Sequence, residues 1–121
     1  MNNLYQTVRS KENNCLQTKD NMELIISPQA ENEIDDIYHY LFLRFSVDIA
    51  DEKINGLYKS IFRLLEHPFM GRSLDGHDEN LRILSSPPNV VIYNINDRVL
   101  EVLHVVDART NYISNIFPDM K

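Results

Sequence analysis

Arginine and tyrosine side chains are the groups of this sequence best suited to chemistry or recognition. Arg82 lies in the run "LRILS", Tyr93 lies in "NVVIYNI", and Arg109 and Tyr112 lie at the end of "VLEVLHVVDARTNY". Arginine beside tyrosine on one face of a sheet can anchor a protein partner. The same groups can hold a phosphodiester, where arginine stabilises developing negative charge. A third interpretation treats the arginines as ordinary solvated residues, and the residues alone leave all three open.

Two further residues belong to the candidate binding set. Arg72 follows Gly71 after the second predicted helix, where it either contacts a partner or ties the loop to a helix terminus. His104 lies in the middle of an apolar run. We interpret it as a semi-buried histidine with satisfied hydrogen bonds rather than as an acid–base group.

The sequence has no pattern typical of a metal or cofactor site. The four histidines are scattered, with no i, i+4 pair and no neighbouring cysteine. A phosphate-binding glycine-rich loop and a G-x-S-x-G motif are both absent. Cys15, the single cysteine, lies in a polar segment and is a poor candidate nucleophile. We therefore expect neither a metal nor a cofactor.

Two consecutive helices are predicted after a short apolar strand at 23–27. Ser27 can cap the first helix and Pro28 suits its first position. Its apolar residues recur at helical spacing: Ala30, Ile34, Ile37, Tyr38, Leu41, Phe42 and Phe45. Ser46 can cap the second helix, which ends at "HP", 67–68. Its stripe comprises Ala50, Ile54, Leu57, Tyr58, Ile61, Leu64 and Leu65. With almost no linker, the two form an antiparallel hairpin.

The C-terminal half changes to β-branched and aromatic runs at 81–85, 89–95 and 98–106. The last run is apolar on both parities, with Val99, Leu103 and Val105 on one and Leu100, Val102 and Val106 on the other. Such a strand is covered on both faces. Two helices cover one face, so the C-terminal segment or a partner chain must cover the other. Arg82 points to that second face if Leu81 and Ile83 point towards the helices. The predicted order is β-α-α-β-β-β, an α+β fold with a helical hairpin packed on a small, largely antiparallel sheet.

Length and charge limit the classes of protein. The 121 residues suffice for one core. We expect 1–21 to be a flexible polar extension and 22–121 to be the folded domain; an ordered arm is the alternative for 1–21. The formal net charge of −6 disfavours direct DNA binding. The sequence has no long apolar run and no signal peptide, and it has a single cysteine. These features favour a cytoplasmic protein with no membrane contact.

Several pieces in order resemble the RelE/ParE superfamily of type II toxin–antitoxin toxins, ParE more than RelE. "ELIISPQAENEIDDIYHYL" resembles the opening strand and helix, and "HPFMGR" resembles P-x-x-G-R. "NLRILS" resembles the strand with its arginine, and "VVIYNINDRVLEVLHVVDART" resembles the final hairpin. The resemblance covers about 90 residues from Met22 onward.

This resemblance implies a toxin held inactive by a cognate antitoxin, a DNA-binding dimer whose C-terminal segment wraps the toxin in a hetero-oligomer. ParE-like members inhibit DNA gyrase through protein contact, whereas RelE-like members cleave mRNA on the ribosome, generally without a metal. The second activity would make Arg82, Arg109 and Tyr112 catalytic. An inactive homologue is a further alternative.

Family arginines map onto Arg72, Arg82 and Arg109 of this chain. Target or antitoxin binding would use these arginines with Tyr93 and His104. The sequence departs from the family at Asp107, where many ParE-like sequences have histidine two residues before the final arginine. A carboxylate at this position repels a phosphate, and it does not supply the histidine that would act as a general base. Together with the acidic charge, this departure favours the gyrase inhibitor over the nuclease.

Overall fold

The computed structural model of the protein describes residues 15–17, 22–74 and 80–116. Its strands are β1 (Cys15–Gln17), β2 (Glu23–Ile26), β3 (Arg72–Ser73), β4 (Leu81–Ser86), β5 (Asn89–Asn96) and β6 (Val99–Asp107). They form a six-stranded sheet in the order β1-β2-β6-β5-β4-β3. The β2–β6 pair is parallel and the other pairs are antiparallel. The α+β fold class and the largely antiparallel sheet are therefore confirmed.

Three of the 21 residues in the predicted N-terminal extension fall within the described residues. They form β1, which pairs with β2 at the edge of the sheet. Residues 1–14 and 18–21 lie outside the described part of the chain.

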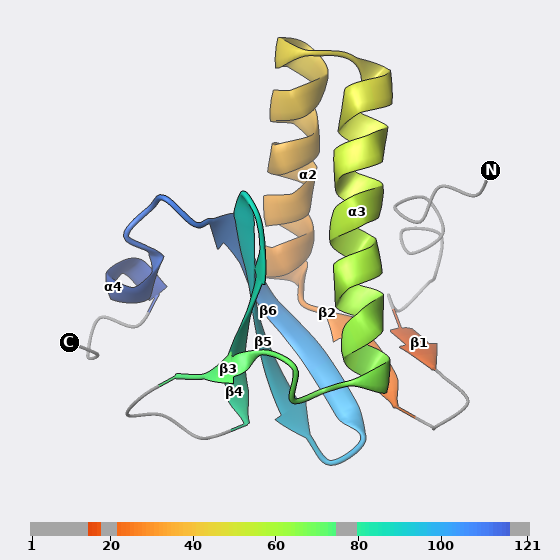
Figure 1. Cartoon of the computed structure of the whole chain (residues 1–121), viewed down its shortest axis with the longest axis vertical. Helices are drawn as coiled ribbons and strands as arrows, with labels where there is room; N and C mark the ends of the chain where they lie inside the picture. Colours follow the sequence, from red (N-terminus) through yellow and green to blue (C-terminus); the bar gives the residue numbers. More distant parts are fainter. Residues whose placement is uncertain (1–14, 18–21, 75–79, 117–121) are drawn as a thin grey trace.

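The two predicted helices are present with their predicted caps. They are α2 (Pro28–Arg44) and α3 (Val47–Glu66), and they stand side by side in Figure 1. The Ser27 hydroxyl accepts the Ala30 N–H at 3.0 Å, and the Ser46 hydroxyl accepts the Ile49 N–H at 3.1 Å. Each bond satisfies a backbone donor that has no partner inside the helix.

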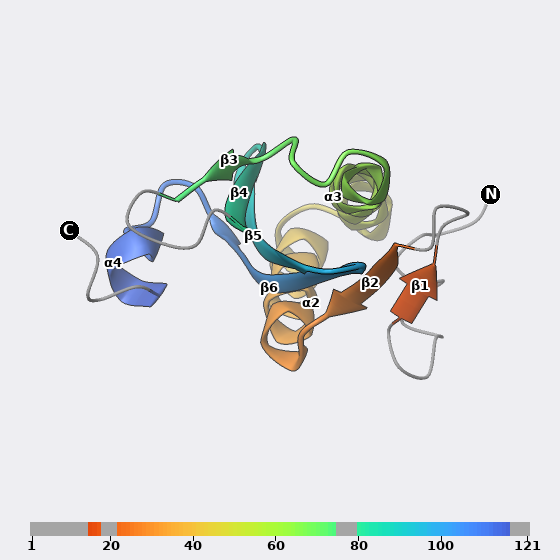
Figure 2. The ribbon, with the colours of Figure 1, turned by 90° about the horizontal axis from the view of Figure 1, so that it is seen from below.

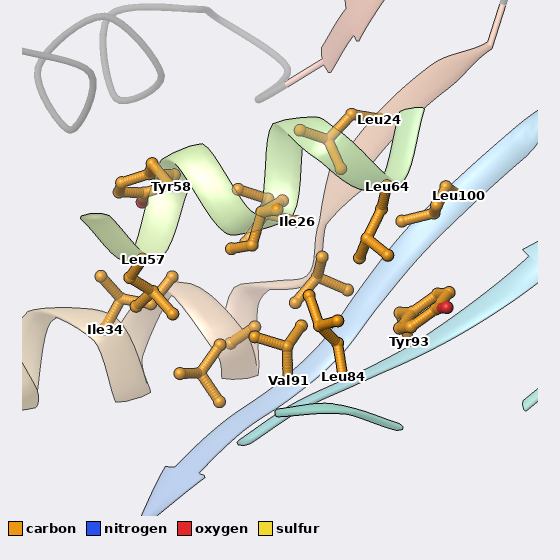
Figure 3. Packing of buried hydrophobic residues seen from close by; sticks show 14 of the residues in the cluster. Leu24, Ile26, Ile34, Leu57, Tyr58, Leu64, Leu84, Val91, Tyr93 and Leu100 are labelled. Carbon is orange, nitrogen blue, oxygen red and sulfur yellow. The ribbon is translucent and has the colours of Figure 1, made fainter. Parts of the chain in front are cut away.

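The two predicted apolar stripes are buried to different extents. All seven stripe residues of α3 are buried. All of them except Ala50 belong to the main core, which Figure 3 shows packed with β2, β5 and β6. In α2 only Ala30 and Ile34 are buried, whereas Phe42 and Phe45 are 44% and 61% exposed. The predicted apolar stripe is therefore not buried at the end of α2, because that end extends beyond the sheet (Figure 1).

A short helix that the sequence did not predict covers apolar surface on the second face of the sheet. Helix α4 (Tyr112–Ile116) lies on the opposite side of β4 and β5 from α3 (Figure 2). Its residues Tyr112, Ile113 and Ile116 pack against a second core of Leu74, Ile83, Val90 and Ile92. The C-terminal segment therefore covers apolar surface that a partner chain was also a candidate to cover.

A bulge in β6 changes the predicted facing of its side chains. Tyr93 of β5 pairs with Val102, but Ile92 pairs with His104, so Leu103 is an extra residue in β6. The predicted alternation of β6 side chains between the two faces of the sheet was therefore wrong for the residues after Leu103. Val105 joins Leu100 and Val102 in the main core, whereas Val106 packs in the second core.

Helix α2 satisfies the backbone groups of β6 beyond the end of β2. The Ser27 hydroxyl donates to the Leu103 carbonyl at 3.0 Å, and Glu33 Oε1 accepts the Val105 N–H at 2.9 Å. Because unpaired backbone groups at a strand edge need other partners, these side chains fix α2 against the edge of β6.

Candidate functional site

The loop after α3 is held by the hydroxyl of a buried tyrosine. Tyr93, fully buried in β5, donates from Oη to the Pro68 carbonyl at 2.7 Å and accepts the Gly71 N–H at 3.0 Å. Burial raises the pKa of the Tyr93 phenol, an effect partly offset by the Gly71 hydrogen bond and nearby Arg82. The hydroxyl therefore keeps the proton that it donates to Pro68. Tyr93 was predicted as a binding residue, and in the structure it is part of the core.

Arg82 lies on the same side of the sheet as Tyr93, its cross-strand partner. Its Nη1 donates to the Gly71 carbonyl at 2.6 Å and to the Phe69 carbonyl at 3.4 Å. Its guanidinium carbon lies 4.7 Å from the centre of the Phe69 ring, a cation–π contact. Leu81 and Ile83, not Arg82, pack in the second core. On the sequence alone, Arg82 was placed on the second face if Leu81 and Ile83 pointed towards the helices. This condition was wrong, because Leu81 and Ile83 lie on the face that α4 covers and Arg82 lies on the opposite face.

Arg72 is the exposed member of this group. It lies in β3, where it pairs with Ile83, while its neighbour Ser73 pairs with Arg82. The structure thus brings Arg72, Arg82 and Tyr93 to one corner of the sheet, with Arg82 and Tyr93 bonded to the loop after α3 and Arg72 at the surface.

Arg109 is paired with the acid that departs from the family pattern. Its Nε and Nη2 donate to Asp107 Oδ1 and Oδ2 at 3.0 and 2.7 Å, and its backbone N–H donates to Oδ1 at 2.8 Å. These bonds lower the pKa of the Asp107 carboxyl to about 2. The carboxylate is therefore charged at neutral pH and occupies the fork with which Arg109 would bind a phosphate.

His104 has a partner that the sequence did not suggest. Its Nδ1 lies 3.2 Å from Glu33 Oε2, and the side chains of His104 and Glu33 are 25% and 19% exposed. The semi-buried state predicted for His104 is confirmed. His104 and Tyr112 line a shallow hollow of about 460 Å³ between α2 and α4, together with Asp107. Glu33 was missed in the sequence because it lies outside the apolar stripe of α2, on a face that the pattern predicts to be exposed to solvent.

A larger groove of about 690 Å³ lies between the helical hairpin and the turn joining β4 to β5. Ile37, Leu41 and Leu57 line its apolar part, and Asp36, Glu52 and Asp107 add carboxylates against Lys53. Gly56 of α3 also lines the groove, and a methyl group added there would meet no atom within 4 Å. The groove therefore suits a segment that combines apolar and basic side chains.

Within the part of the chain that the structure describes, no three His, Cys, Asp or Glu residues gather as a metal site. Of the helices in that part, none combines the length and apolarity needed to cross a bilayer.

Comparison with known proteins agrees with this geometry. Residues 24–112 match the family described as the ParE toxin of the type II toxin–antitoxin system parDE. Toxin ParE1 of Caulobacter vibrioides is 35% identical over 90 residues, which are 71% of this chain and 88% of that protein. Toxin ParE1 of Mycobacterium tuberculosis is 25% identical over 93 residues, covering 76% and 95% of the two chains. The chain belongs to the ParE toxin family of type II toxin–antitoxin systems.

A solved structure described as the chromosomal ParDE TA system from P. aeruginosa has the same fold. It superposes with a TM-score of 0.62 at 15% identity, covering 71% of this chain and 95% of the other.

Proposed function

We propose that this ParE-family toxin inhibits DNA gyrase by protein contact and is neutralised by a cognate antitoxin. The observation that carries the proposal is the separation of the three residues that a nuclease would use. Arg82 bonds to the loop on the α3 side of the sheet, whereas Tyr112 packs in the second core on the α4 side. Arg109 is paired with Asp107. Inhibition by contact requires no convergence of these groups, whereas general acid–base catalysis does.

The groove beside the hairpin supports the antitoxin part of the proposal. Its apolar lining and its excess of carboxylates over Lys53 favour an antitoxin segment with apolar and basic residues. The net charge of −6 likewise supports protein partners over direct contact with DNA.

Pulse-labelling of DNA and protein synthesis in a bacterial host tests the target class. Induction of the full chain without antitoxin should stop DNA synthesis first while translation continues. Tyr112→Phe keeps the ring that packs in the second core and removes only the hydroxyl. It should therefore arrest growth as the parent does. Translation that falls first, with relief by Tyr112→Phe, would contradict the proposal and favour a nuclease.

A further inference from the structure

The turn between α2 and α3 exposes an apolar surface that the fold does not use. Of the seven large hydrophobic side chains exposed in the described part of the chain, five belong to residues 40–47: Tyr40, Phe42, Leu43, Phe45 and Val47. Leu43 is 80% exposed and Phe45 is 61% exposed. We call residues 40–47 the hairpin tip, which lies at the end of the helices away from the sheet (Figure 1). An exposed apolar cluster of this kind marks an interaction site.

The charge of the hairpin tip differs from that of the rest of the protein. No carboxylate occurs between Asp36 and Asp48, and Arg44 is the cation of this span in a chain of net charge −6. The Arg44 guanidinium carbon lies 5.7 Å from the centre of the Tyr40 ring. Aromatic residues beside arginine are enriched where interfaces gain most of their binding energy. The hairpin tip therefore complements an apolar pocket bordered by carboxylates.

The hairpin tip is also held in one shape before any partner arrives. The Ser46 cap and the bond from the Phe45 N–H to the Leu41 carbonyl at 2.9 Å fix the turn through the backbone. The exposed side chains are thus free for a partner without unfolding of the turn, which lowers the ordering cost of binding. A second copy of this chain is a poor occupant. A two-fold contact between tips would bring the two Arg44 side chains together, with no carboxylate from 37–47 to pair them.

We propose that the hairpin tip is the surface that enters the protein target, with Leu43 and Phe45 as apolar anchors and Arg44 paired with a target carboxylate. This inference rests on the proposed function, inhibition of gyrase by contact. It places the target contact away from Arg72 and Arg82. Because Tyr40 belongs to the tip and also lines the groove, an antitoxin segment in the groove would compete with the target.

Supercoiling of relaxed plasmid by purified bacterial gyrase, titrated with the full chain, tests this surface. Leu43→Ser, Phe45→Ser and Arg44→Glu should each raise the concentration for half inhibition by about tenfold or more. Met70→Ser is the control, because Met70 is another exposed hydrophobic residue, at 39%, beyond the other end of α3. It should change that concentration less than about twofold. Thermal unfolding confirms that each variant is folded.

The outcomes separate the two proposals. If the parent inhibits gyrase and the tip variants inhibit equally well, or if Met70→Ser loses as much as they do, the assignment of the tip is overturned and the gyrase proposal stands. If sedimentation shows a dimer that the tip variants dissociate without loss of gyrase inhibition, the tip is a self-association surface and the assignment is also overturned. If the parent itself does not inhibit gyrase, the proposed function fails, and the assignment fails with it.

Discussion

Replacement of Gly71 by alanine should destabilise the protein strongly, because the loop after α3 touches the sheet at this residue. A Cβ on Gly71 would lie 2.6 Å from the Ile83 carbonyl oxygen and 2.7 Å from Tyr93 Oη, whereas ordinary contact begins at 3.4 Å. The first neighbour is backbone inside β4, so the loop itself must move outwards. That movement breaks the hydrogen bond from the Gly71 N–H to Tyr93 Oη.

The expected loss has two parts. Overpacking costs about 1–3 kcal/mol, and an unsatisfied buried polar group costs about 1–3 kcal/mol. A combined loss of about 3 kcal/mol in the free energy of unfolding would lower the melting temperature by about 12 °C or more. Urea denaturation of the purified full chain measures the free energy, and a thermal scan measures the melting temperature.

Gly56→Ala is the matched control for this prediction. Gly56 lies exposed in α3 with no atom within 4 Å of an added Cβ. The same substitution there should stabilise the helix by about 0.8–1 kcal/mol. Tyr93→Phe should lower the free energy of unfolding by about 1–3 kcal/mol. The double variant with Gly71→Ala should lose less than the sum of the two single losses, because both substitutions remove the same hydrogen bond between the Gly71 N–H and Tyr93 Oη. A Gly71→Ala variant within about 0.5 kcal/mol of the parent would refute the reasoning.

Two other predictions concern the edge and the end of β6. Glu33→Ala leaves the Val105 N–H without its acceptor. It should lower the free energy of unfolding in urea by about 1–3 kcal/mol, whereas Glu33→Gln keeps an acceptor oxygen and should lose less; equal losses would contradict this role. The Asp107 carboxyl should titrate by NMR near its lowered pKa of about 2, and Arg109→Ala should move it towards 3.8. Because the folded pKa is lowered, the pair stabilises the fold above about pH 3.8 and loses this effect as pH falls through about 2; an unchanged midpoint in Arg109→Ala would count against the pairing.

The sequence by itself determined strands β2, β4, β5 and β6, helices α2 and α3, and their order. Ser27-Pro28 and Ser46 marked both helix starts because capping is a local interaction between neighbouring residues. The α3 stripe was predicted in full, since its spacing places all seven residues on one face of the helix and that whole face is buried. The turn between β5 and β6 is likewise a local feature, since Asp97 has a φ of 57°, which aspartate tolerates better than most residues.

Only the tertiary structure decided what the candidate residues touch. The bulge at Leu103 reverses the facing of the residues after it, and a bulge arises from pairing between strands that periodicity cannot reveal. Arg82 and Tyr93 both hydrogen-bond to Gly71 in the loop after α3, because the β4–β5 register places them opposite each other. The α2 stripe is apolar throughout, yet its last residues are exposed because the sheet ends before the helix does. An apolar pattern predicts that a surface will be covered, but the arrangement of the layers decides whether the chain or a partner covers it.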